Sequence, residues 1–395
     1  MTQQTSRRAF LRGAMGAMMA SHGIRGWAAT EQKGEVLVRR VDRARMLRLA
    51  AESMKVPVAT VTSFPAQRSP GGPHDFYSEA DYFWPNPKNP AGPYVEVDGR
   101  SNPDNFLDHR KVMLAMAMAV PALTAGWVVT KKNVYAERAV EHLRAWFVTA
   151  ATRMTPNLEY AQAVRQGVSG RSWGIIDTLH LAEVARAASV LEQTKAMTGE
   201  DGAGVAAWFR EYLGWLQHSK KGMAERDASN NHAVAWALQA AEFARLVNDE
   251  ATRQAVRERY QAVLIEQMSR DGSYPRELKR TKPYGYSIFN FDVMAGLAWS
   301  LGGEQEIRWS TTDGRGMCRA AAFLYPYLND KSSWPYAKDV QHFDAWPVRS
   351  PGLLFCGLAC GRDEYLKLWE RLDPDPKDAE VNRNFPIRQP LLWML

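Results

Sequence analysis

From residue 104 almost to the C-terminus, apolar residues recur at spacings of three and four positions. Trp208, Tyr212 and Trp215 form one such group, and this spacing places their side chains on one face of an α-helix. Runs of alternating polar and apolar residues, which would indicate β-strands, do not occur in the sequence. The pattern predicts helices at residues 106–130, 136–150, 174–194, 203–219, 231–248, 250–268, 286–301, 315–328, 351–360 and 364–372.

The predicted helices are of two kinds. Residues 231–247 and 286–301 are apolar nearly all round, whereas residues 250–268 carry one charged face. Alternation of fully buried and half-buried helices predicts an all-α fold of two concentric rings, an α/α toroid of helical hairpins, incomplete or closed. Chemistry in such a toroid is expected at one mouth, where the inner helices begin. We assign the toroid to residues 104–395 and leave the number of hairpins open, because no sharp repeat is present.

A segment rich in proline and aromatic residues precedes the helices. Residues 62–103 contain eight prolines, a density that excludes helix and leaves extended or turning chain. The same segment is too aromatic for a disordered linker, and Trp84 within it is a candidate for sugar contact. With a predicted helix at 36–51, it forms an N-terminal extension at 29–103. The loop is either a lid or groove wall, or simply a packed extension.

The first 28 residues have the features of an export signal. Arg7 and Arg8 form a twin-arginine pattern, and a weakly apolar stretch follows at residues 13–20. Small residues at Gly26 and Ala28 suit a signal peptidase, so we predict cleavage near Ala28 and a periplasmic or secreted protein. The alternative is a frayed basic N-terminus. We expect no other stretch to reach the roughly 18 apolar residues of a membrane span, and therefore no membrane insertion.

The net charge of +7 is mild and dispersed, with no long block of Lys or Arg. This pattern argues against a nucleic-acid partner. A modest positive field would raise the local concentration of an acidic polysaccharide. The charge gives no indication of the oligomeric state.

Three cysteines cannot all pair with one another. The three are Cys318, Cys356 and Cys360, and the last two could lie one helical turn apart, a spacing more typical of buried thiols than of a disulfide framework. Cysteine and histidine do not occur at zinc-binding spacings. We therefore predict no metal site and no cofactor.

Residues 229–232 read Ser-Asn-Asn-His and open a strongly apolar helix. One asparagine would be an ordinary helix cap, but Asn230 and Asn231 followed by His232 exceed what capping needs. An amide and an imidazolium together can neutralise the carboxylate of a uronic acid. The proton on the neighbouring carbon then becomes easier to remove, an effect typically worth roughly a few kcal/mol. Capping alone is the competing interpretation.

Residues 280–286 read Arg-Thr-Lys-Pro-Tyr-Gly-Tyr and precede a second apolar helix. Tyr286 is the candidate proton shuttle. A phenol has an ordinary pKa of about 10, so it needs nearby cations to act as a base. Arg280, Lys282 and His232 are the expected sources of that field. Tyr284 is the alternative phenol, and a tyrosine that only packs its ring is the structural alternative.

Further polar side chains suit a sugar-binding wall. Asn157, Tyr160 and Gln162 offer donors and acceptors for hydroxyl groups, and the fork of Arg171 suits a carboxylate. Arg349, in a later aromatic loop, is a candidate for a second carboxylate. Loop structure is the competing interpretation for all of them.

Several of these segments together resemble the alginate lyase superfamily over about residues 75–360. The segments that carry the resemblance are 82–87 (Tyr-Phe-Trp-Pro-Asn-Pro), 157–162, 174–178, 230–232 and 280–287. Single motifs are weak, but their order and spacing are fairly specific. The resemblance implies an α/α toroid and metal-free β-elimination on β-1,4-linked polyuronates.

The resemblance also implies roles for individual residues. Asn231 and His232 match the family's Asn-His pair, and Tyr286 matches its tyrosine, which acts as base, acid or both. The family's arginine lies seven residues before the tyrosine, where this chain has Lys279, so Arg280 is one position off. With this shift and the long N-terminal loop rich in proline and aromatic residues, the chain resembles sibling families that include mannuronan and glucuronan lyases more closely. The preferred uronate therefore stays open.

Two other functions fit an exported helical protein. A glycoside hydrolase of the same fold would need a pair of carboxylic acids. The candidates for that pair are Asp177, Glu225, Asp227, Asp271 and Glu277. A polysaccharide-binding protein without catalysis is the second alternative.

Overall fold

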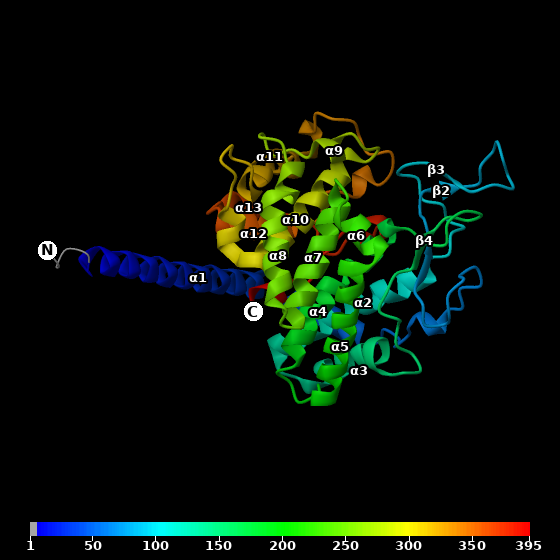
Figure 1. Ribbon diagram of the computed structural model, residues 1–395, viewed down its shortest axis with the longest axis horizontal. Coiled ribbons are helices and arrows are strands. Elements are labelled where there is room, and N and C mark those ends of the chain that lie inside the picture. The colour runs from blue at the N-terminus through cyan, green and yellow to red at the C-terminus, as the bar shows by residue number, and fades with distance from the viewer. Residues whose placement is uncertain (1–5) are drawn as a thin grey trace.

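The computed structural model describes residues 6–395, with side chains from residue 30 onward, and the body is built mainly of helices (Figure 1). Nearly every predicted helix is present, which confirms the all-α fold. The helices are α1 Ser6–Ser53, α2 Asp108–Thr130, α3 Asn133–Leu143, α4 Leu181–Leu191, α5 Gly199–His218, α6 Lys220–Arg226, α7 Asn231–Leu246, α8 Glu250–Ala262, α9 Pro275–Leu278, α10 Pro283–Arg308, α11 Met317–Asn329, α12 Pro351–Ala359, α13 Asp363–Arg371 and α14 Ala379–Arg383.

The helices form an inner and an outer layer. In the described chain, α2, α4, α7, α10 and α12 pack against one another in that order. Each is followed in the sequence by an outer helix: α3, α5, α8, α11 and α13 respectively. Helix α7 is buried at every residue except His232 and Arg245, whereas α8 buries only Thr252, Val256 and Tyr260. The two predicted kinds of helix are therefore the two layers of an α/α toroid.

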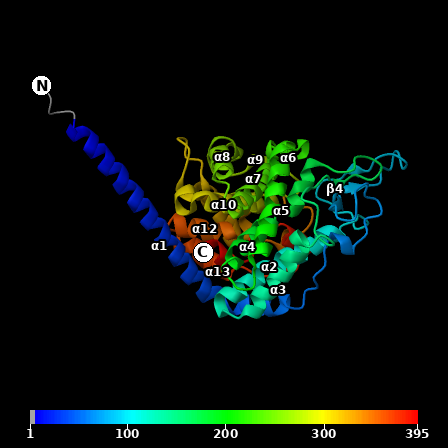
Figure 2. The same ribbon diagram turned by 60° about the horizontal axis from the view of Figure 1, so that its bottom comes forward.

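Helix α1 runs from a free end to the body of the protein. Figures 1 and 2 show its first part pointing away from the side of the molecule that carries β4 (Tyr160–Ala163), and its second part lying against the toroid. That second part packs on α2, α10 and α12 through buried Val38, Met46 and Ala50. Residues 1–5 of the proposed signal lie outside the described chain. Cleavage near Ala28 remains a prediction.

Helix α2 corrects one expectation. It is long and apolar enough to cross a membrane by composition, with a mean hydropathy of 2.0 in its most apolar window. However, 67% of that window is buried inside the protein, against α1, α3 and α4. The apolar surface is thus used by the core, and α2 is the first inner helix of the toroid.

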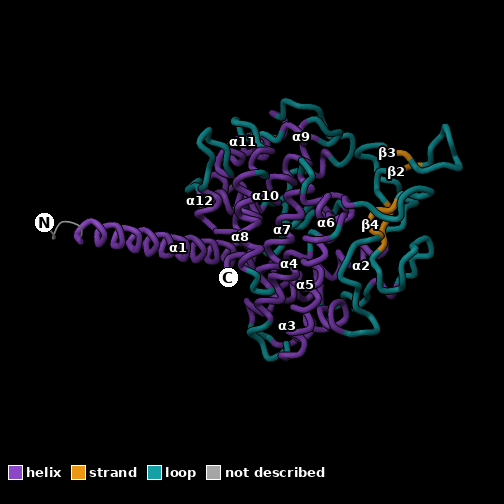
Figure 3. Tube along the Cα trace, in the orientation of Figure 1, coloured by secondary structure: helices purple, strands orange, loops and turns teal. Residues whose placement is uncertain are grey.

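The proline-rich segment carries three of the four short strands of the described chain, β1 to β3 (Figure 3). Strand β1 (Tyr77–Glu79) pairs in parallel with β4, and β2 (Phe83–Trp84) pairs antiparallel with β3 (Val95–Glu96). These strands are too short to show alternation in the sequence. The segment lies beside the starts of the inner helices and supplies one wall of the cavity described below.

Two predicted helices differ in detail. The helix predicted at 136–150 ends in a π-helical turn at Arg144–Val148, and the one predicted at 174–194 starts as a 3₁₀ helix at Ser172–Thr178. Helix α6 was not predicted, because seven residues are too few for a periodic pattern. A Cβ at Gly222 in α6 would collide with the carbonyl oxygen of Leu216. Glycine therefore allows α6 to approach the end of α5 closely.

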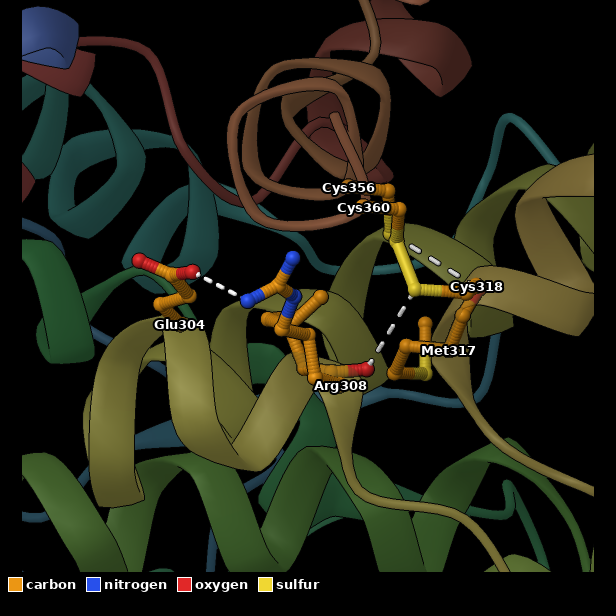
Figure 4. The surroundings of a disulfide bond; sticks show 7 residues. Glu304, Arg308, Met317, Cys318, Cys356 and Cys360 are labelled. Carbon is orange, nitrogen blue, oxygen red and sulfur yellow. Dashed lines mark hydrogen bonds and ion pairs between the residues drawn. A yellow bond between two sulfur atoms is a disulfide. The ribbon is translucent and has the colours of Figure 1, made fainter. Parts of the chain in front are cut away.

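The cysteine prediction is partly wrong. Cys318, in α11, forms a disulfide with Cys360 at the end of α12, and only Cys356 is a buried free thiol (Figure 4). The pairing joins two helices, so spacing along one helix gave no sign of it. The C-terminal tail docks on the body as its composition suggests, with Leu391, Leu392 and Trp393 buried.

Candidate active site

A cavity of about 290 Å³ lies where α7 and α10 begin, as expected for a toroid of this kind. Its walls come from the proline-rich loop, the 3₁₀ helix at Ser172–Thr178, the two helix starts and the end of α14. The predicted site residues that line it are Gln162, Arg171, Asn230, Asn231, His232, Arg280 and Tyr286. The imidazole and the phenol on which the prediction depends therefore face one shared cavity.

His232 is the second residue of α7 and leans on a buried glutamate. Its Nδ1 lies 2.6 Å from Oε1 of Glu225, which is fully buried in α6. An ionised carboxylate only accepts hydrogen bonds, so beside an ionised Glu225 the hydrogen of a neutral imidazole lies on Nδ1 and the lone pair on Nε2. The ring of Trp173 lies 5.6 Å from the imidazole on the same cavity wall.

Asn231 is held in the same manner by a second glutamate. Its backbone N–H donates to Oε1 of Glu277 at 2.9 Å, and its Nδ2 donates to Oε2 at 2.7 Å. Burial raises the pKa of Glu277, against the opposing effect of these two hydrogen bonds. Asn230 is the N-cap of α7, since its side chain accepts from the N–H of His232 at 3.4 Å. Asn230 therefore caps the helix, whereas Asn231 presents its amide to the cavity.

Tyr286 stands in the first turn of α10, between another phenol and an arginine. Its hydroxyl lies 2.9 Å from that of Tyr82 and 3.4 Å from Nη2 of Arg280. The guanidinium of Arg280 also lies over the Tyr286 ring, 4.4 Å from its centroid. Two hydrogen bonds to Asp98, at 2.6 and 3.2 Å, hold the fork of Arg280 in place.

Electrostatics make Tyr286 a neutral phenol at rest. Burial raises its pKa, and the opposing effects of Arg280 and of the hydrogen bond with Tyr82 are too small to reverse the shift. The expectation that nearby cations would lower this pKa is therefore wrong. The charge of Arg280 is shared with Asp98, and that of Lys282 is matched by Glu380 at 3.0 Å.

Arg171 lines the cavity in contact with the proline-rich loop. Its Nη2 donates to Oε1 of Gln162 at 3.1 Å, and its guanidinium lies 4.5 Å from the ring of Phe83 and 4.9 Å from that of Trp173. Gln162 adopts a left-handed backbone with φ of 49°. Non-glycine residues in this region are uncommon and often occur at functional sites. Its Nε2 donates to Asp177 at 3.1 Å.

A charged network behind Tyr82 was not predicted. The hydroxyl of Tyr82 donates to Glu380 at 3.1 Å, and Arg383 pairs with both Glu380 and Asp81. Although burial works against it, Arg383 and Lys282 lower the pKa of Glu380 to about 2. Glu380 and Arg383 belong to α14, which begins 71 residues after the end of α10. Only the fold brings them together, so local sequence gave no sign of them.

Several predicted residues lie outside the cavity because their side chains are used in the scaffold. The Asn157 side chain accepts from the N–H of Glu159 in a turn, and Tyr160 lies in β4. Trp84 donates from Nε1 to the carbonyl of Arg100 at 2.9 Å. Of the strand β2, it is the neighbouring Phe83 that lines the cavity.

Three further assignments are corrected in the same way. Lys282 is buried outside the cavity, where its ammonium group forms an ion pair with Glu380. Tyr284 is fully buried, and its hydroxyl donates to the carbonyl of Tyr327 at 2.9 Å. Arg349 pairs with Asp42 of α1 and donates to backbone carbonyls of the C-terminal region, so it belongs to the scaffold.

The carboxylates considered for a hydrolase are already engaged. Asp177 accepts from Ser78 and Gln162, and Glu225 and Glu277 support His232 and Asn231. Asp227 pairs with Arg226 and Arg259, and the Asp271 side chain accepts from Ser273. The described residues also contain no group of three or more His, Cys, Asp and Glu side chains arranged to hold a metal ion.

The arrangement combines a neutral phenol, an imidazole with a free lone pair, an amide and two guanidinium groups around one cavity. Such a set can hold a carboxylate, accept a proton from the carbon beside it and give a proton to a leaving oxygen.

Comparison with known families decides the class of protein, because residues 60–334 match the alginate lyase family. This match covers more than half of the chain. The chain belongs to the alginate lyase family. It is accordingly a polysaccharide lyase, which confirms the resemblance found in the sequence. A comparison with curated protein sequences found no match.

Solved structures of alginate lyases share the fold. A crystal structure of an alginate lyase from Bacteroides ovatus is 28% identical, with a TM-score of 0.76 over 92% of this lyase and 97% of that chain. Alginate lyase A1-III from Sphingomonas species A1 is 17% identical, with a TM-score of 0.50 over 82% of this chain and 88% of that one. A histidine-to-alanine variant of A1-III, complexed with a tetrasaccharide, has 14% identity and a TM-score of 0.51 over 79% and 84%.

Proposed function

We propose that this lyase cleaves β-1,4-linked polyuronates, either alginate and polymannuronate or glucuronan, by β-elimination that needs no metal. The observation that carries the proposal is the shared cavity, which His232 and Tyr286 line together with Asn231, Arg171 and Arg280. The A1-III structure with a bound tetrasaccharide supports an oligosaccharide-sized ligand for this fold. Each cleavage leaves a 4,5-unsaturated uronate at the new non-reducing end and an ordinary reducing end on the other fragment.

Carboxylate binding is the first task of the site. Asn231 presents an amide whose orientation Glu277 fixes, and Arg280 and Arg171, which line the same cavity, supply positive charge. These donors neutralise the substrate carboxylate and stabilise the negative charge that develops beside C5 when its proton leaves. Preorganised donors of this kind act without reorganising during the reaction.

Proton transfer is the second task. A base takes the proton from C5, the electron pair of the C5–H bond forms the C4–C5 double bond, and the C4–O4 bond breaks toward oxygen. O4 then takes a proton from an acid. The lone pair on Nε2 of His232 suits the base, and the protonated phenol of Tyr286 suits the acid.

The geometry of the sugar decides between two routes. On guluronate the C5 proton and O4 lie on opposite faces, so His232 as base and Tyr286 as acid fit directly. On mannuronate and glucuronate they lie on the same face, and Tyr286 alone performs both steps after losing its own proton. Because burial raises the pKa of Tyr286, we expect this second route to speed up as the pH rises above neutral.

The proposal is tested with purified protein and four polymers: polymannuronate, polyguluronate, glucuronan and hyaluronan. Ultraviolet absorbance of the unsaturated uronate reports each elimination. We expect turnover on at least one of the first three, unchanged after treatment with EDTA. New reducing ends formed without ultraviolet absorbance would indicate a hydrolase, and tight binding without turnover would indicate a binding protein.

We further propose export by the twin-arginine route to the periplasm or beyond. Arg7 and Arg8 support it, and so does the Cys318–Cys360 disulfide, because disulfides persist in oxidising compartments. Fractionation of cells that express the full chain tests this, with an Arg7→Lys and Arg8→Lys double variant as control. Equal export of both proteins would contradict the route.

A further inference from the structure

Glu225 is a fully buried carboxylate that meets the site at one atom only. Its Oε1 lies 2.6 Å from Nδ1 of His232, and its Oε2 is buried without a hydrogen-bond partner among the described residues. Burying a carboxylate costs free energy unless its partners compensate. A buried glutamate with a single hydrogen-bond partner is not expected to stabilise the fold. Its position is therefore explained better by its effect on the His232 imidazole.

Resting on the proposed lyase function, we propose that Glu225 is the positioning residue that makes His232 a base. It accepts the hydrogen of Nδ1 and so holds the neutral imidazole in the tautomer whose Nε2 lone pair is free at the cavity. When Nε2 takes the C5 proton, the imidazole becomes a cation with hydrogens on both nitrogens. The negative charge of Glu225 stabilises that cation until the proton leaves.

The local fold fixes Glu225 from several sides. Helix α6 is capped by Ser219, whose side chain accepts from Gly222 N–H at 2.9 Å, and Gly222 lets α6 lie close to α5. On the outer side, Arg259 donates to the carbonyl of Arg226 at 2.7 Å and so holds the turn that leads to α7. The carboxylate is therefore preorganised relative to the imidazole seven residues later.

The other glutamate at the site serves a different group, which provides a matched control. Glu277, from α9, is equally well buried but accepts from Asn231 rather than from His232. Replacing either glutamate by glutamine removes one buried negative charge. Only the change at Glu225 alters the partner of Nδ1.

The kinetic test compares Glu225→Gln with the wild type on polyguluronate, the polymer on which His232 is the proposed base. A glutamine presents either an acceptor or a donor to Nδ1, so it no longer fixes one tautomer. We expect kcat to fall by about 10²–10⁴-fold with KM changed less than about threefold. Glu225→Asp keeps the charge and should recover part of the loss. A kcat for Glu225→Gln within about threefold of wild type on polyguluronate would overturn the proposal.

A spectroscopic test does not depend on turnover. In full-length protein with ¹⁵N-labelled histidine, NMR reports which ring nitrogen carries the hydrogen, and a His232→Gln spectrum assigns the signal. We expect hydrogen on Nδ1 in the wild type and in Glu277→Gln, and a mixture of tautomers in Glu225→Gln. Hydrogen on Nε2 in the wild type would overturn the inference, even if Glu225→Gln does not fold.

The two measurements separate this inference from the proposed function. If the wild type cleaves none of the polymers but its His232 carries hydrogen on Nδ1, the lyase assignment fails and the positioning by Glu225 stands. If the wild type is active and Glu225→Gln loses activity with its tautomer unchanged, Glu225 acts only as scaffold.

Discussion

Removal of one oxygen atom from Tyr286 tests the site most directly. In Tyr286→Phe the ring keeps its place at the start of α10, but the hydroxyl that lies 2.9 Å from Tyr82 and 3.4 Å from Arg280 is absent. The hydroxyl of Tyr82 still donates to Glu380, and Arg280 still pairs with Asp98. Because no buried partner is left unpaired, we expect a loss of only about 1 kcal/mol in stability.

Catalysis should respond far more strongly than stability. The phenol is the acid in one route and both acid and base in the other, and a positioned proton donor is typically worth about 10²–10⁴-fold in rate. We therefore expect kcat to fall at least about a hundredfold on every polymer that the wild type cleaves. Initial rates come from ultraviolet absorbance of the unsaturated product, and stability comes from urea unfolding.

The chain offers a matched control two residues earlier. Tyr284→Phe removes the same atom from a fully buried tyrosine whose hydroxyl donates to the carbonyl of Tyr327. We expect about 1 kcal/mol of destabilisation and kcat within about threefold of wild type. If Tyr286→Phe and Tyr284→Phe have similar kcat values, the assignment of the proton donor is refuted.

Other substitutions probe the supports of the site and the scaffold. Arg280→Lys keeps the charge but loses the fork that grips Asp98, so kcat/KM should fall at least roughly tenfold. Arg349→Ala should cost about 3 kcal/mol in unfolding free energy and leave kcat unchanged, since Arg349 only ties α1 to the C-terminal region. Burial raises the pKa of Asp292 to about 7, so its contribution to stability is complete below about pH 4 and lost by about pH 7. Asp292→Asn should therefore gain about 4 kcal/mol relative to wild type between pH 4 and pH 8 in urea unfolding, and an equal pH dependence in both would contradict the assignment.

The sequence predicted the parts of the site that depend on local pattern. Asn231, His232, Arg280 and Tyr286 stand at the starts of two apolar helices, and the toroid brings such starts together. The sequence was less informative about which side chain of a motif points into the cavity. Tyr284 is two residues from Tyr286, which is about 200° around an α-helix, so the two phenols face different surroundings.

Long-range partners were beyond any local pattern. Tyr82 meets Tyr286 across 204 positions of chain. Nothing near Tyr82 in the sequence indicates that its hydroxyl would reach Glu380. The pKa of Tyr286 was predicted in the wrong direction because the burial that raises it is produced by the tertiary fold. The anions that offset the nearby positive charge also come from distant segments.

Segments outside residues 60–334 also support the site, and truncated chains test the size of that support. Helix α14 supplies Glu380 and Arg383, and the preceding turn is tied to α1 by Arg45, which bonds Asp375 at 2.7 Å and the carbonyl of Pro374 at 3.0 Å. A chain starting at residue 29 keeps all these interactions, so its activity and unfolding free energy should match those of the full chain.

A chain starting at residue 54 lacks the buried side chains of α1 as well as the hydrogen bonds of Arg45. We expect it to lose roughly 5 kcal/mol or more in stability. Its kcat at a temperature where it is still folded should also fall, because α14 is no longer held against Tyr82. If the residue-54 chain, still folded, has full kcat, α1 stabilises the toroid without supporting the site. If the residue-29 chain is already impaired, the proposed cleavage near residue 28 is wrong, since processing would then inactivate the enzyme it releases.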